Sequence, residues 1–154
     1  MAESAESILK AMGIDLPPMA APAANYVPSV RTGNLLFVSG QVSISPAGRF
    51  VGKVGRDLTI EEGQQAARIC AINILANLKA SLGSLEKVGR IVKLVGFVNC
   101  IPEFEDPHKV VNGCSDLLTE VLGARGKHAR SAVGMATLPL GAAVEVEVIV
   151  EVAA

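Results

Sequence analysis

The sequence is poor in aromatic residues and in charge. Of its 154 residues, 3% are aromatic, with four Phe, one Tyr and no Trp, and 19% are charged. The formal net charge is −1 and no run of basic residues occurs. The chain therefore lacks both the cationic surface and the stacking rings with which proteins hold nucleic acids, so we expect no nucleic-acid partner.

Long apolar runs and metal-binding patterns are also absent. No apolar stretch reaches membrane-spanning length without a charge or a glycine, and the first residues lack the order of a signal peptide, which predicts a cytoplasmic protein with no membrane partner. Cys70, Cys100 and Cys114 show no CxxC spacing and lie in apolar segments, which is typical of reduced core residues. With two histidines in the chain, we expect no metal site and no Ser-His-Asp triad.

Apolar residues make up 50% of the chain, a high fraction for a protein of this size. One domain is expected at 154 residues, and the low charge predicts that some apolar surface is buried between copies of the chain. We expect residues 1–24 to form a short helix at 3–12 and a Pro- and Ala-rich arm at 15–25, and residues 25–154 to form the domain.

Two long amphipathic helices are predicted. Thr59 and Glu62 match a capping box and precede apolar residues at helical spacing, which continue to Gly83. Asp106-Pro107 supplies an N-cap and a proline at the first position of a second helix, which ends at Gly123.

Strands are predicted before, between and after these helices. We expect them at 35–42, 49–54, 91–101, 129–137 and 143–152. This order predicts an α+β fold in which both helices cover one face of a sheet. Because no third long helix is available for the other face, we expect it to pack against neighbouring subunits, with a binding site at the seam.

One arginine and one glutamate stand out inside the last two predicted strands. A guanidinium keeps its charge and is costly to bury alone, so an anion is expected at Arg130. That anion is either a protein carboxylate, such as Glu145, or a ligand. Glu145, Glu147 and Glu151 share one face of the last strand, which is also typical of a charged face in water.

Several short motifs resemble the RidA/YjgF family in order and spacing over about residues 25–153. They are Gly33-Asn34-Leu35-Leu36-Phe37-Val38-Ser39-Gly40-Gln41, Val98-Asn99, Asn112, Ala129-Arg130-Ser131, Leu138-Pro139 and Val144-Glu145-Val146-Glu147. The resemblance implies a chorismate-mutase-like α+β fold with a mixed sheet, and a homotrimer with clefts between subunits. It also implies cofactor-free hydrolysis of reactive 2-imino or 2-enamino acids to 2-oxo acids and ammonia, as by a 2-iminobutanoate/2-iminopropanoate deaminase. Older names in the family refer to endoribonuclease L-PSP, an activity that the composition of this chain disfavours.

The resemblance also assigns site residues. Arg130 matches a carboxylate-binding arginine, and Glu145 matches an acidic residue expected to orient water. The pocket-lining positions are Tyr26, Ser39, Gly40, Asn112, Ser131 and Ala132. From the residues alone, structural alternatives stay open: core packing for Tyr26, a strand end for Ser39-Gly40, and a hydrogen bond to a loop for Asn112.

The chain departs from the family pattern at several positions. Ala132 stands where many members have cysteine, Ser43 where they have proline, and Gly134-Met135 where they have Glu-Val. The N-terminal segment is also longer, so we expect a distinct, longer subgroup in which the departures bear on the substrate range more than on the chemistry. The alternative function is a trimeric protein that binds small carboxylates or partner proteins without turnover.

Overall fold

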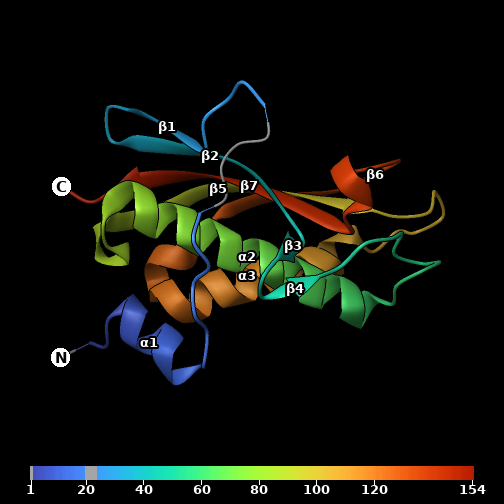
Figure 1. Cartoon of the computed structure of the whole chain (residues 1–154), viewed down its shortest axis with the longest axis horizontal. Coiled ribbons are helices and arrows are strands. Elements are labelled where there is room, and N and C mark those ends of the chain that lie inside the picture. The colour runs from blue at the N-terminus through green and yellow to red at the C-terminus, as the bar shows by residue number, and fades with distance from the viewer. Residues whose placement is uncertain (1, 20–23) are drawn as a thin grey trace.

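A five-stranded mixed sheet with two long helices on one of its faces forms the body of the protein (Figure 1). The computed structural model describes residues 2–19 and 24–154. The helices are α1 (Ala5–Ala11), α2 (Ile60–Leu82) and α3 (Pro107–Leu122). The strands of the sheet, in spatial order, are β1 (Ser29–Thr32), β2 (Leu35–Val42), β7 (Val144–Val152), β5 (Val88–Asn99) and β6 (Ala129–Met135). The predicted α+β arrangement is confirmed.

The longest helix, α2, has the ends that its sequence predicts. The Thr59 hydroxyl accepts the Glu62 N–H at 3.1 Å, and the Glu62 carboxylate accepts the Thr59 N–H at 2.8 Å, which completes the capping box. Gly83 follows the helix with a φ of 84°, a left-handed conformation that glycine adopts at little cost. The buried residues of α2 pack against α3, β2 and β7.

The second long helix, α3, connects two parallel strands. Because β5 and β6 are parallel neighbours, the chain must cross over between them, and α3 makes this crossing on the helix-covered face. The two helices approach closely at Gly113, where an added Cβ would overlap the backbone of Gln64. Pro107 is the first helical residue, as predicted. The Asp106 side chain makes no capping hydrogen bond, however, and lies 3.4 Å from the Lys109 ammonium.

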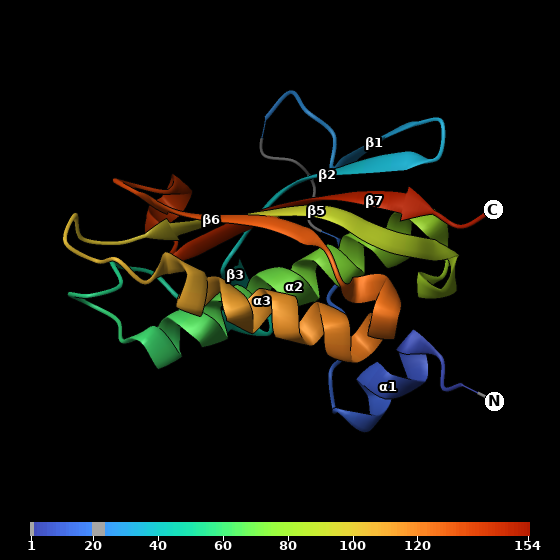
Figure 2. The ribbon, with the colours of Figure 1, turned by 180° about the vertical axis from the view of Figure 1, so that it is seen from behind.

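The central strand, β7, defines two different faces of the sheet. Val144, Val146 and Val148 are at most 2% exposed beneath the helices, whereas Glu145 and Glu147 alternate with them and point to the opposite side. We call that side the open face, because neither long helix covers it (Figures 1 and 2). It also carries apolar side chains from β7 and from the other strands of the sheet, namely Ile149, Phe37, Val95, Val133 and Met135. The open face therefore has apolar area for contact with another protein surface.

The structure corrects three strand predictions. β1 was not predicted, and it pairs with β2 through a turn at Gly33. The predicted strand at 49–54 is wrong, because its residues form only the end of a small hairpin of β3 (Ile44–Ser45) and β4 (Gly48–Arg49) outside the main sheet and isolated bridges at Val51 and Val54. β5 begins at Val88 rather than at position 91.

The short helix α1 packs against α3 on the side away from the sheet (Figure 2). Two carboxylates fasten it to the turn before β5. The Glu86 carboxylate accepts the Ala5 N–H at 2.8 Å, and the Glu6 carboxylate accepts the Leu85 N–H at 2.9 Å. The predicted short helix is thus confirmed, while residues 20–23 of the predicted arm lie outside the described residues.

All three cysteines are buried and unpaired, as predicted. Burial raises the pKa of each thiol above its ordinary value, which keeps the thiols protonated. Within residues 2–19 and 24–154, no helix is both long and apolar enough to cross a bilayer. Over the same residues, no cluster of three or more His, Cys, Asp or Glu side chains could hold a metal ion.

Candidate functional site

Six of the eight site residues predicted from the sequence lie in two separate groups within one subunit. The first surrounds a guanidinium beside α3, and the second lies where β2 pairs with β7. We call the first the arginine group, made of Asn112, Ser115, His128 and Arg130. We call the second the carboxylate group, made of Tyr26, Ser39, Gly40 and Glu145.

Arg130 lies near the start of β6, with its side chain directed at α3. Its Nη1 donates to Asn112 Oδ1 at 2.8 Å and to Ser115 Oγ at 3.2 Å, and its Nη2 donates to the His108 carbonyl at 3.2 Å. A guanidinium has five N–H donors, and the two that remain, on Nε and Nη2, have no partner in the described part of the chain. Since Nε and Nη2 share one edge of the guanidinium, this edge is suited to a two-point contact with a carboxylate.

The ion pair considered from the sequence does not form within the subunit. Among the ion pairs of the described residues, none involves Arg130. Arg130 points toward α3 on the helix-covered face, whereas Glu145 lies on the open face between two buried valines. The sheet itself separates the two side chains, so the expected anion at Arg130 is not Glu145 of the same subunit.

Ser115 and His128 belong to the arginine group, although sequence reasoning did not identify them. His128 Nδ1 lies 2.6 Å from the Gly126 carbonyl oxygen, which can only accept, so Nδ1 carries the hydrogen. Nε2 of the neutral ring is then an acceptor, and Ser115 Oγ donates to it at 2.9 Å. Their spacing in the sequence could have identified them. Ser115 follows Asn112 by about one helical turn and so shares its helix face, and His128 precedes Arg130 by two residues and so points to the same side of the strand.

Glu145 lies directly over Gly40 in the carboxylate group. A Cβ added at Gly40 would overlap the Glu145 carboxylate, so this close approach requires glycine. A bulge in β2 between Val38 and Gln41 shifts the strand register at this point. Partial burial, together with the negative charge of Glu147, raises the pKa of Glu145. A carboxyl group with a raised pKa is suited to taking up and returning a proton.

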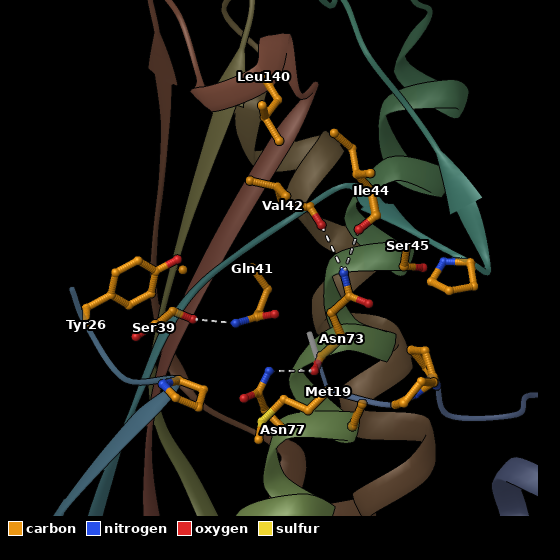
Figure 3. A pocket seen from close by; sticks show the side chains of 16 residues that line it. Met19, Tyr26, Ser39, Gln41, Val42, Ile44, Ser45, Asn73, Asn77 and Leu140 are labelled. Carbon is orange, nitrogen blue, oxygen red and sulfur yellow. Dashed lines mark hydrogen bonds between the residues drawn. The ribbon is translucent and has the colours of Figure 1, made fainter. Parts of the chain in front are cut away.

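Tyr26, Ser39 and Gly40 line a cavity of about 290 Å³ beside β2 and α2 (Figure 3). Ser39 Oγ donates to the Val27 carbonyl at 2.7 Å, which ties β2 to the segment that carries Tyr26. Tyr26 is 54% exposed, so the core-packing alternative is wrong. The cavity thus brings together three of the predicted site residues, and Glu145 adjoins it at Gly40.

Three side-chain amides line the same cavity, one from β2 and two from α2 (Figure 3). Gln41 donates to the Ser39 carbonyl at 3.0 Å, Asn73 to the Val42 carbonyl at 3.0 Å, and Asn77 to the Asn73 carbonyl at 3.2 Å. Each amide therefore uses its nitrogen on the backbone and keeps its oxygen available. Asn77 is 4% exposed, and its Oδ1 has no hydrogen-bond partner among the described residues.

Replacing Asn77 with leucine should therefore stabilise the protein. The change removes the unpartnered oxygen at similar volume, and we expect the free energy of unfolding in urea to rise by about 1 kcal/mol. Asn73→Leu is the matched control: it leaves the carbonyls of Val42 and Ile44 without their donor and should lower that free energy. A clear loss of stability in Asn77→Leu would mean that Oδ1 has a partner in solution.

The two remaining predicted residues follow Arg130 on β6. Ser131 lies on the open face, where its hydroxyl accepts from Lys93 Nζ at 3.3 Å. Ala132 turns back toward the helices, packs against the core and pairs with Gly96 of β5. Because β6 is the last strand of the sheet, the backbone groups along its outer edge have no neighbouring strand in the described residues.

Comparisons with known sequences identify the family of the chain. The family model described as "YjgF/chorismate mutase-like, putative endoribonuclease" matches residues 6–152. Protein TCP17 of Trypanosoma cruzi is 50% identical over 145 residues, which are 93% of this chain and 91% of TCP17. The 2-iminobutanoate/2-iminopropanoate deaminase of Escherichia coli strain K12 is 33% identical over 131 residues, which are 84% of this chain and 90% of that protein.

The fold is also that of solved structures. The crystal structure of Atu1372 from Agrobacterium tumefaciens, a protein of unknown function, superposes with a TM-score of 0.89. It shares 50% identity, and the match covers 96% of this chain and 92% of Atu1372. The family match extends from within α1 to the end of β7 and so includes both site groups. This chain is a member of the YjgF/RidA family.

Proposed function

We propose that this protein hydrolyses 2-imino and 2-enamino acids to 2-oxo acids and ammonia. The observation that carries the proposal is the Nε–Nη2 edge of Arg130, which remains available after the other donors are used. Such substrates carry a carboxylate next to the reacting carbon, so a two-point contact would fix the position of that carbon. The Escherichia coli relative named as a 2-iminobutanoate/2-iminopropanoate deaminase, at 33% identity, supports this reaction.

The active site in this proposal is shared between subunits. Arg130 and Glu145 lie on opposite sides of the sheet, so one subunit alone cannot bring both to the same substrate. The apolar open face and the unpaired edge of β6 offer surfaces to a neighbour. A homotrimer satisfies both conditions, because each cleft can take the arginine group from one subunit and the carboxylate group from the next.

In this cleft Glu145 orients the attacking water. The carboxylate accepts a hydrogen from the water as its oxygen bonds to C2 of the C=N group, and the proton passes to the nitrogen. Glu145 then transfers the hydroxyl proton of the tetrahedral intermediate to the amino nitrogen as the C–N bond breaks, so ammonia leaves and the C–O bond becomes the carbonyl of the 2-oxo acid. The raised pKa of Glu145 suits a group that takes up and returns one proton. No electrons are transferred, so these steps require no redox cofactor.

The other predicted residues shape the cleft in this proposal. Gly40 lets the ligand approach the backbone beside Glu145, and the exposed Tyr26 closes one wall of the cavity. Asn112 holds the guanidinium. Ser131 and Ala132 contribute backbone groups on the outer edge of β6. No thiol takes part there, because Ala132 stands where many members of the family have cysteine.

An assay of the wild-type protein tests the proposal. A pyridoxal-phosphate lyase generates 2-iminopropanoate in the presence of semicarbazide, which traps the imine. We expect added protein to decrease the trapped imine and to increase pyruvate, because hydrolysis competes with trapping. If trapping stays unchanged while calorimetry detects binding of 2-oxobutanoate, the deaminase proposal is wrong, and a binder of small carboxylates is favoured instead.

A further inference from the structure

A chain of hydrogen bonds connects the backbone at Gly126 to the guanidinium of Arg130. His128 Nδ1 donates to the Gly126 carbonyl at 2.6 Å, Ser115 Oγ donates to His128 Nε2 at 2.9 Å, and Arg130 Nη1 donates to Ser115 Oγ at 3.2 Å. A carbonyl can only accept and a guanidinium can only donate. With a neutral His128 ring, each of these three hydrogen bonds therefore has only one possible donor.

We propose that Ser115 and His128 are positioning residues that determine which edge of Arg130 faces the carboxylate of a ligand. This inference rests on the proposed function, in which Arg130 binds that carboxylate. Asn112 and Ser115 together occupy the two hydrogens of Nη1, and the His108 carbonyl occupies one hydrogen of Nη2. Only the Nε–Nη2 edge then remains for two-point binding.

His128 has a specific part in this arrangement. A serine in a helix ordinarily turns its hydroxyl hydrogen to the carbonyl of the preceding turn. Here the acceptor Nε2 of His128 takes that hydrogen, so the oxygen of Ser115 presents a lone pair to Nη1 of Arg130. Without this acceptor, the hydroxyl could rotate and release one Nη1 hydrogen.

The histidine is itself held firmly against α3. A Cβ added at Gly126 would overlap the backbone of Leu118, so the turn before β6 lies directly on the helix. The Gly126 carbonyl that orients the ring is therefore fixed to the same helix that carries Ser115 and Asn112. The helix, the turn and the side chains form a single support for the guanidinium.

The test is a set of binding measurements with 2-oxobutanoate as the probe, made by calorimetry on the full-length protein. Ser115→Ala and His128→Leu should each raise the Kd about tenfold, because one charge-assisted hydrogen bond no longer fixes the arginine. His128→Gln keeps an acceptor near the position of Nε2 and should restore the Kd to within about threefold of wild type. In the trapping assay, Ser115→Ala should raise KM more than it lowers kcat.

Thr119→Ala is the matched control. Thr119 lies one turn after Ser115 on α3, and its side chain has no hydrogen bond to Arg130, so its Kd should equal that of wild type. The inference is overturned if Ser115→Ala binds like wild type, or if His128→Gln binds as weakly as His128→Leu. The two proposals can fail separately. If the wild-type protein leaves imine trapping unchanged but the variants weaken binding of 2-oxobutanoate as expected, the proposed reaction is wrong and the positioning role of Ser115 and His128 stands.

Discussion

Replacing Arg130 with lysine should lower kcat/KM for 2-iminopropanoate hydrolysis about 100-fold, although the positive charge is kept. An ammonium is a single point of charge and cannot reproduce the two parallel donors of the Nε–Nη2 edge. It would also leave Asn112, Ser115 and the His108 carbonyl with fewer donors than the guanidinium supplies. Arg130→Ala should remove catalysis altogether, because the substrate carboxylate would then have no cation. Initial rates of semicarbazone formation at several substrate levels measure both effects.

The control for these variants is Arg56→Lys. Arg56 is an exposed arginine that pairs with Asp57 at 2.9 Å and belongs to neither site group, so its replacement should leave the rate unchanged. Far-UV circular dichroism and thermal unfolding show whether each variant keeps the fold. A folded Arg130→Ala protein with the wild-type rate would overturn the assignment of this residue.

The helices could be predicted because their signals are local. The capping box at Thr59 and the glycine at 83 determine the ends of α2 through contacts within a few residues, and the structure reproduces both. Asp106 shows the limit of this reasoning. It occupies the N-cap, but its carboxylate makes no capping hydrogen bond and lies 3.4 Å from the ammonium of Lys109, a charge that competes with the backbone N–H groups.

The strands were predicted less completely because their pairing is not local. β1 has one partially buried residue and otherwise exposed residues, so it lacks the apolar pattern on which strand prediction depends. Its existence follows from pairing with β2 across the turn at Gly33. Conversely, 49–54 has suitable residues, but only Arg49 pairs in a ladder. Gly52, at a φ of 122°, interrupts the rest of the segment.

The site shows the same contrast between local and distant information. Arg130 and Glu145 were identified from their strands, but their positions on opposite faces depend on strand order and register, which one sequence does not reveal. Asn112 meets Arg130 because the parallel crossover places α3 over β6. Ser115 and His128 were missed because neither lies in the motifs recognised in the sequence, and their contacts with Arg130 and with each other form only once α3 and β6 are adjacent.

Mixing two inactive variants should restore activity if the cleft is shared between subunits. Arg130→Ala keeps the carboxylate group, and Glu145→Gln keeps the arginine group. In a randomly mixed cyclic oligomer, about a quarter of the clefts receive an intact arginine group from one subunit and an intact Glu145 from its neighbour. Co-refolded equal mixtures should therefore regain about a quarter of the wild-type rate, whereas each variant alone should stay inactive.

The matched control is an equal mixture of Arg130→Ala and Arg130→Lys, in which every cleft lacks the guanidinium. This mixture should show no more activity than the average of its two components, even though its subunits exchange in the same way. Mass spectrometry of the intact oligomer confirms that mixed species have formed and counts their subunits. If mixed oligomers of Arg130→Ala and Glu145→Gln stay inactive, the two residues do not act in one cleft between subunits. Since the sheet also separates them within a subunit, the assignment of Glu145 as the group that orients water would then be wrong.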